Sequence, residues 1–430
     1  MMNMKIIKAI STVASMVLLF LLITFSIELI GMGKETKVYK VDYKELHSVK
    51  YGMFNSDIWT MKILNIMDNK IDNFEINLEN RTTIEGYVGT VIDTLISETE
   101  RMLKEQNKGG EGLLETLIGS TKQMITDTII DFKALHARVP EFTTMIMKEI
   151  EKPENQAMTK RVIREKLKEF MQKEFEKSTD MSAYNALLQK YNSDDLKECS
   201  ILLEDKIHHN TLLMNGDMLK ILFMALLIIF LVVFQGQLMT LGLLILTSTT
   251  LTLLVSGIML PMLEIEAKVV KLYFMVLDKP IIFENQILFF QSKSISDLLS
   301  LLLHSQEGKM VFVGVLLGTF SVIFPLLKVL SITIYFYFKR IGQHPIIKFF
   351  ALSSTKWSMA DVMVVSIFMA YLGLDGVVGS ELSKLEAQRN AVNMISSNGT
   401  HLEVGFFLFL GFVFSSFVLS IVVKQADREN

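Results

Sequence analysis

The stretch VFVGVLLGTFSVIFPLLKVLSITIYFYF (311–338), followed by a short basic loop and WSMADVMVVSIFMAYLGL (357–374), decides the fold. Both apolar runs are long enough to cross a bilayer, since a transmembrane helix needs about 20 residues. Pro325 and Lys328 lie deep in the first run, and Asp361 lies near the start of the second. Because a charge at the bilayer centre costs on the order of 3 kcal/mol, such residues usually face protein or water. The two runs therefore predict a membrane hairpin with a polar interior.

Four further apolar runs bring the expected number of membrane spans to six. Half of the 430 residues are hydrophobic and the formal net charge is -3. These values indicate a multi-spanning membrane protein with a soluble part, and they argue against nucleic acid as a partner. The first run follows two lysines and resembles a signal peptide, but its length favours a retained helix over a cleaved one. The four runs are 6–30, 218–233, 238–262 and 404–423.

The rest of the chain predicts a mostly α-helical protein with one small β-ribbon. Residues 33–215 are charged and amphipathic with helical spacing, which predicts a large helical extracytoplasmic domain, and 73–78 alternates like a short strand. Between the third and fourth spans, 271–277 and 281–290 are rich in β-branched and aromatic residues and predict a two-stranded ribbon. A short amphipathic helix over 298–303 follows, and 379–401 is expected to be a polar loop. The predicted division is 1–32, an N-terminal membrane helix; 33–215, the extracytoplasmic domain; 216–237, the second membrane helix; and 238–430, a four-helix membrane module.

Charged loop residues set the expected topology. Lys339, Arg340 and Lys348 lie in the loop between the fourth and fifth spans, and an excess of Lys and Arg marks the cytoplasmic side. Both termini are then cytoplasmic and the 33–215 domain is outside. Lys34, Lys37 and Lys40, just after the first span, and five lysines between Lys268 and Lys309 run against this rule.

The charges inside the hairpin are the candidate functional residues. Pro325 lacks an N–H and is expected to kink its helix, which frees backbone carbonyls. Lys328 lies about 15 Å from Phe338 at 1.5 Å per residue, too deep to reach water easily. Asp361 enters the next span from the same side. Two interpretations remain open: a structural ion pair between Lys328 and Asp361, or a polar lining that binds a lipid headgroup or couples protons.

Other polar residues have simpler explanations. Trp357 is expected to be an interfacial anchor. Glu264, Glu266 and Asp375 are expected near the outer face, either lining an exit vestibule or as solvated interfacial acids. Cys199 is the only cysteine, which excludes an internal disulfide and a cysteine-rich zinc site. With no catalytic constellation, metal site or nucleotide loop in the sequence, we expect a protein that is not an enzyme and needs no cofactor.

Five segments, taken in order, resemble one module of a known family. They are IMLPMLEIEA (258–267), SISDLLSLL (294–302), FSVIFPLLKVL (320–330), KWSMADVMVVSIFMAYL (356–372) and GFFLFLGFVFSSFVLSIVV (405–423). Together they resemble the paraquat-inducible protein A family, PqiA and its relative LetA. Familiar members carry two modules and cysteine-pair zinc ribbons, whereas this chain has one module and no ribbon.

The resemblance implies a bacterial inner-membrane protein with a periplasmic 33–215 domain. Family members act beside proteins with mammalian-cell-entry (MCE) domains, which carry lipids between membranes. Phospholipid trafficking with membrane lipids and an MCE-type periplasmic partner is therefore the leading expectation. The alternative is a scaffold or envelope-stress sensor whose outer domain binds a protein or ligand. The oligomeric state is left open.

Overall fold

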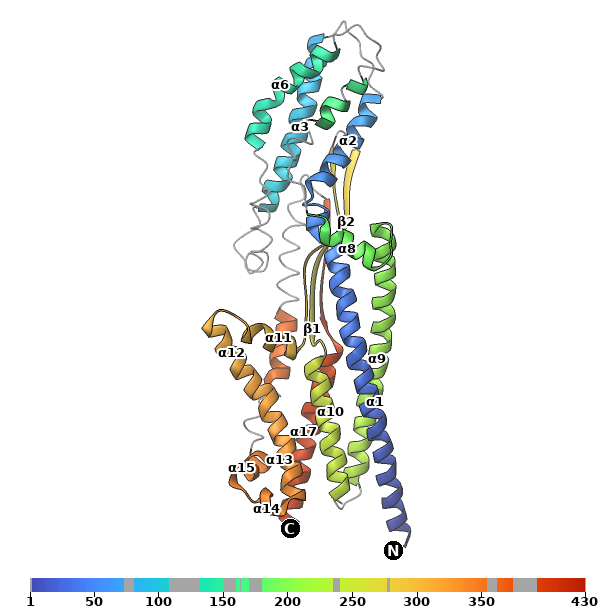
Figure 1. The fold of residues 1–430 in the computed structure, drawn as a ribbon, viewed down its shortest axis with the longest axis vertical. Helices are drawn as coiled ribbons and strands as arrows, with labels where there is room; N and C mark the ends of the chain where they lie inside the picture. The colour runs from blue at the N-terminus through green and yellow to red at the C-terminus, as the bar shows by residue number, and fades with distance from the viewer. Residues whose placement is uncertain are drawn as a thin grey trace.

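A computed structural model describes residues 2–72, 81–107, 132–150, 160–162, 164–169, 180–234, 240–276, 279–353, 362–373 and 393–429. The molecule is elongated (Figure 1): a bundle of helices at one end, a long sheet rising from it, and a second group of helices beyond the sheet. Both chain termini lie at the free end of the bundle. We call the group of helices that contains both termini the bundle, the middle part with the sheet the stalk, and the group of helices beyond the sheet the head.

Five helical segments are long and apolar enough to span a membrane, judged by length and composition. They lie in α1 (Met2–Leu46), α9 (Leu196–Phe234), α10 (Thr240–Met259), the α12–η3–α13 run (Gly308–Gly318, Thr319–Ile323 and Phe324–Tyr337) and α17 (Val404–Glu429). Of the expected span 357–374, the described part is a shorter apolar helix, Val362–Gly373. The described structure thus confirms a multi-pass membrane protein with five candidate spans.

Two of the membrane helices also form the stalk. Helix α1 has 45 residues and α9 has 39, so at 1.5 Å per residue they are about 68 and 58 Å long. The hydrocarbon core of a bilayer is about 30 Å thick. Both helices therefore continue well outside the membrane, where they pack side by side (Figure 1). Each runs without a break across a boundary expected from the sequence, at 32–33 and at 215–216.

A three-stranded antiparallel sheet forms the rest of the stalk, in the order β2–β1–β3. The expected ribbon is confirmed as the pair β1 (Leu263–Val276) and β2 (Lys279–Lys293), longer than predicted. The expectation of a polar loop over 379–401 was wrong for its last part, because β3 (Asn393–Leu402) is a strand paired with β1. The NMISSNGTHL segment shows no apolar alternation, and the exposed edge of β1 supplies its backbone hydrogen bonds.

The sheet starts where two bundle helices meet it. At the end of α10, the carbonyl groups of Pro261 and Met262 accept hydrogen bonds from the N–H groups of Gly405 and Glu403, at the start of α17. A Cβ at Gly405 would lie 2.3 Å from the Leu260 carbonyl oxygen, so only glycine allows this approach. The bundle and the sheet are therefore joined rigidly at this point.

The head packs around the tip of the β1–β2 hairpin. Its helices are α2 (Ser56–Asp72), α3 (Arg81–Asn107) and α6 (Phe132–Ile150). The ring of Trp59 in α2 packs against that of Phe283 in β2 at a tilt of 46°, with 4.9 Å between ring centroids, and Val269 and Leu272 of β1 belong to the same buried core. The strand expected at 73–78 lies outside the described residues. The helical head thus shares its core with a hairpin that starts in the bundle.

The remaining elements are short. In the stalk, η1 (Val49–Tyr51) follows α1, and α8 (Ser182–Lys190) precedes α9. Helix α11 (Ile295–Leu303) begins with a capping box in which Ser294 and Asp297 each bond the other's backbone N–H. At the inner end of the bundle lie α14 (Lys339–Gly342), α15 (Pro345–Lys348) and η4 (Phe349–Ser353).

Candidate functional site in the bundle and at its outer end

Pro325 changes the helix in which Lys328 lies. Because Pro325 has no N–H to donate to the preceding turn, a regular α-helix cannot continue through it. The chain responds with a π-helical turn, η3, in which the N–H of Phe324 bonds the carbonyl of Thr319. Such π-turns inside helices are frequent at functional sites. The kink expected from the sequence is thus a local widening of the helix just before Lys328.

Lys328 is almost completely buried, with 2% of its surface exposed. Its Nζ donates a hydrogen bond to Ser416 Oγ at 2.9 Å and makes a longer contact of 3.5 Å with the Ser416 carbonyl oxygen. An ammonium group has three N–H donors. Within the described part of the chain, Ser416 is its hydrogen-bond partner and no carboxylate pairs with it. The cation therefore has donor capacity that the described structure does not use.

Buried hydroxyl groups occur on α10, on α17 and on the η3–α13 run that carries Lys328. Thr250 of α10 and Ser415 of α17 share a hydrogen bond of 2.7 Å, which links the two helices, and Ser420 donates to the Ser416 carbonyl at 2.7 Å. These groups make the centre of the bundle polar, where lipid-facing helices would be apolar. We call the set the hydroxyl seam; its buried members are Thr247, Thr249, Thr250, Ser256, Ser321, Ser331, Ser415, Ser416 and Ser420.

The other predicted site residues fall into two groups. Asp361, Trp357 and Asp375 lie outside the described residues, so the approach of Asp361 to Lys328 stays a prediction. Glu264 and Glu266 lie at the start of β1, beside the outer end of the bundle. Glu266 is partly exposed and lies 3.2 Å from Lys268, whereas Glu264 is buried and makes a contact that sequence reasoning missed.

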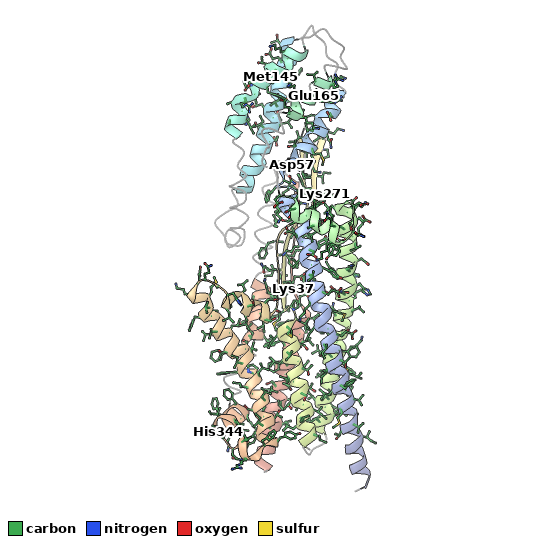
Figure 2. The ribbon with its side chains drawn as sticks, viewed as in Figure 1. Lys37, Asp57, Met145, Glu165, Lys271 and His344 are labelled. Atoms are coloured by element: carbon green, nitrogen blue, oxygen red, sulfur yellow. The ribbon has the colours of Figure 1, made fainter. Side chains whose placement is uncertain are left out.

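The contact of Glu264 is an ion pair with Lys40, which is one of a row of lysines on one face of α1. Lys37 pairs with Asp297 of α11 at 2.6 Å. Lys40 pairs with Glu264 at 2.7 Å and also with Glu403, which precedes α17, at 2.9 Å. Figure 2 shows Lys37 at the level where the sheet meets the bundle. The spacing of these lysines, with Lys44 four residues further on, is the sequence signal that would have indicated one contact face.

Lys44 extends the row along the sheet. Its Nζ donates to the carbonyl of Phe290 in β2 and lies 3.6 Å from the centre of that ring. Beyond it, the His47 carbonyl accepts from the N–H of Ile287. The outer half of α1 is therefore attached to α11, to β1, to the start of α17 and to β2.

Burial and nearby charges shift the pKa values of two carboxyl groups in this region. Burial, together with the nearby charge of Glu403, raises the pKa of Glu264 to about 7 in spite of the opposing effect of Lys40. Asp297 behaves differently. Burial alone would raise its pKa, but hydrogen bonds from Lys37 and Ser294 outweigh it and lower the pKa of this carboxyl. The pKa of Glu264 thus lies close to neutral pH.

Comparison with known proteins bears on the same region. Residues 282–381 match the family model described as Paraquat-inducible protein A. This part of the chain is similar to paraquat-inducible protein A. The resemblance inferred from the sequence is confirmed for these residues, which include Pro325 and Lys328. No curated protein and no solved structure matches the chain.

Proposed function

We propose that the protein is a non-enzymatic component of phospholipid trafficking in the bacterial inner membrane, with the head and stalk in the periplasm. The observation that carries the proposal is the buried ammonium of Lys328, which bonds the Ser416 hydroxyl and has unused donors within the described residues. The match of this segment to the paraquat-inducible protein A family supports a membrane role.

A sixth membrane pass belongs to this proposal. The fourth span ends near α14 and α15, at the bundle end where both termini lie (Figure 1). Strand β3 begins at Asn393, which pairs with Tyr273 far along the sheet. A return pass between these points, through the segment that contains the apolar helix Val362–Gly373, fits these two end points. Six passes place both termini on one side and the head on the other.

Lys328 suits the phosphate of a phospholipid headgroup. A phosphate oxygen accepts strong hydrogen bonds from an ammonium group, and the Ser416 hydroxyl, whose oxygen accepts from Lys328, lies beside it. The π-helical turn before Pro325 lies next to this point, where the helix is already widened. The bundle would hold a headgroup here, and the head would dock an MCE-type partner that receives the lipid.

Photocrosslinking tests the proposal. The protein is placed in nanodiscs that contain a photoreactive phosphatidylglycerol analogue, and crosslinked peptides are identified by mass spectrometry. We expect labelling on α13 and α17, and a loss of about tenfold or more in Lys328→Met, because hydrogen bonds to charged groups contribute about 1.5–3 kcal/mol each. Lys309→Met, an exposed lysine at the outer end of the same span, is the matched control.

Two outcomes would contradict the proposal. Equal labelling of wild type and Lys328→Met would show that the lysine does not contact lipid. Labelling confined to lipid-facing side chains such as Phe312, which is 63% exposed, would show that lipid stays outside the bundle. Excess inorganic phosphate is included as a competitor, since protection by phosphate would indicate a site for a free anion.

A scaffold or sensor is the second candidate. The observation that favours it is the shared core of the head, in which Phe283 of the hairpin packs on Trp59. A partner that tilts the head would move a strand that begins at the bundle. A stable complex with a periplasmic protein and no lipid labelling on α13 would favour this function over lipid trafficking.

A further inference from the structure

Three elements that are distant in the sequence meet at Lys40. This lysine reaches from the stalk half of α1 to Glu264, the second residue of β1, and to Glu403, just before α17. The side chains of Lys40, Glu264 and Glu403 are 14%, 9% and 16% exposed. We call these three residues the clamp. It connects α1 to the point where the sheet joins the bundle.

The clamp holds an unequal number of charges. Two carboxylates face one ammonium, so full ionisation leaves an excess negative charge in a largely buried place. A small hollow beside the clamp, open to solvent, is lined by Gly33, Thr36, Lys37, Lys40 and Glu403, among others. Two members of the clamp, Lys40 and Glu403, therefore border a space that is open to water.

We propose that the clamp is proton-operated: it takes up one proton when α1 is docked on the sheet and loses that proton when α1 moves away. With one proton bound, the three groups are neutral as a set and the docked arrangement is favoured. With both carboxylates ionised, the excess charge repels and the contact loosens. The inference concerns the outer junction and does not depend on lipid binding at Lys328.

The direction of the pH dependence follows from the raised pKa of Glu264. Its pKa is about 7 in the docked structure, against an ordinary value of about 4.5. The docked form therefore binds more protons between these values, and docking weakens as the pH rises through about 7. The titratable and charged groups near the clamp, besides its own members, are Lys37 and Lys44 of α1, Glu266 of β1, Lys293 of β2, Asp297 of α11 and His401 of β3.

Electron paramagnetic resonance measures the docking. In the full chain with Cys199→Ala, spin labels are placed at the exposed positions Val41→Cys on α1 and Leu410→Cys on α17, in nanodiscs without added partner. We expect a narrow distance distribution at about pH 6 and a broader one at about pH 8.5, on either side of the pKa of Glu264.

Three variants test whether the clamp causes the pH response of the spin-label distances. Glu264→Gln mimics the protonated carboxyl and should give a narrow distribution at both pH values. Lys40→Met should give a broad distribution at both. Glu266→Gln, on the same strand but outside the clamp, is the matched control and should keep the wild-type response.

An infrared difference spectrum provides a second measurement that needs no cysteine variant. The C=O band of protonated carboxyl groups should lose intensity as the pH rises through about 7, and Glu264→Gln should abolish this change. The proposal is overturned if the wild-type distances do not change with pH, or if their change persists in Glu264→Gln. Either result leaves the crosslinking test at Lys328 unaffected.

Discussion

Replacing Lys328 by methionine decides between the two interpretations of this buried lysine. Methionine keeps an apolar stem of similar shape and removes the ammonium. In the described structure the ammonium makes one good hydrogen bond, 2.9 Å to Ser416 Oγ, and such a bond contributes about 1.5–3 kcal/mol. Removing an ammonium from water costs several kcal/mol. We therefore expect Lys328→Met to raise the free energy of unfolding by about 1–3 kcal/mol while lipid labelling is lost.

A lower free energy of unfolding in Lys328→Met would instead identify a structural ion pair. If Asp361 pairs with Lys328, the methionine leaves a buried carboxylate without its cation, which costs about 3–5 kcal/mol. Unfolding is measured by titration with a denaturing detergent in mixed micelles, followed by far-ultraviolet circular dichroism. The control Lys309→Met should stay within about 0.5 kcal/mol of wild type. A fall of about 3 kcal/mol or more, recovered by adding Asp361→Asn, would refute our reasoning.

Three further substitutions test the packing. Gly257→Leu should destabilise the bundle by about 1–3 kcal/mol in the same titration, because even a Cβ there would lie 2.9 Å from Phe409. Gly216→Ala, where a Cβ meets nothing within 4 Å in mid-helix, should stabilise by about 0.5–1 kcal/mol. Phe283→Ala should cost the head about 3–5 kcal/mol and make it sensitive to protease, since it removes the ring packed against Trp59; an unchanged digestion pattern would contradict a shared core.

Local composition was enough to predict the ribbon and the bundle helices, but not the third strand. The segments 271–277 and 281–290 are rich in β-branched and aromatic residues, above all Ile and Phe, and that composition favours strands wherever they lie. In β3 the pairing of Met394 with Leu272 depends on a residue more than a hundred positions earlier. An edge strand formed in this way leaves little trace in its own sequence.

In the candidate site, too, one part could be predicted from the local sequence and another could not. Burial of Lys328 followed from the cost of a charge in an apolar run, which is a property of the run itself. Its partner Ser416 is 88 residues away, and several serines in the last span were equivalent by sequence. Which of them faces the lysine is fixed by the packing of α17 on its neighbours, so only the tertiary structure could supply that contact.

Two of the lysines that conflict with the topology rule have a structural explanation. The rule treats each Lys near a span as a free charge that resists export. Lys37 and Lys40 are instead paired with Asp297, Glu264 and Glu403, and every one of these acids comes later in the chain. The same charges that weaken the topology signal attach α1 to the segment that resembles paraquat-inducible protein A. Because that segment supplies Asp297 while the flanking regions supply Glu264 and Glu403, the ion pairs of this junction join the N-terminal helix to the membrane module on both sides of the matched residues.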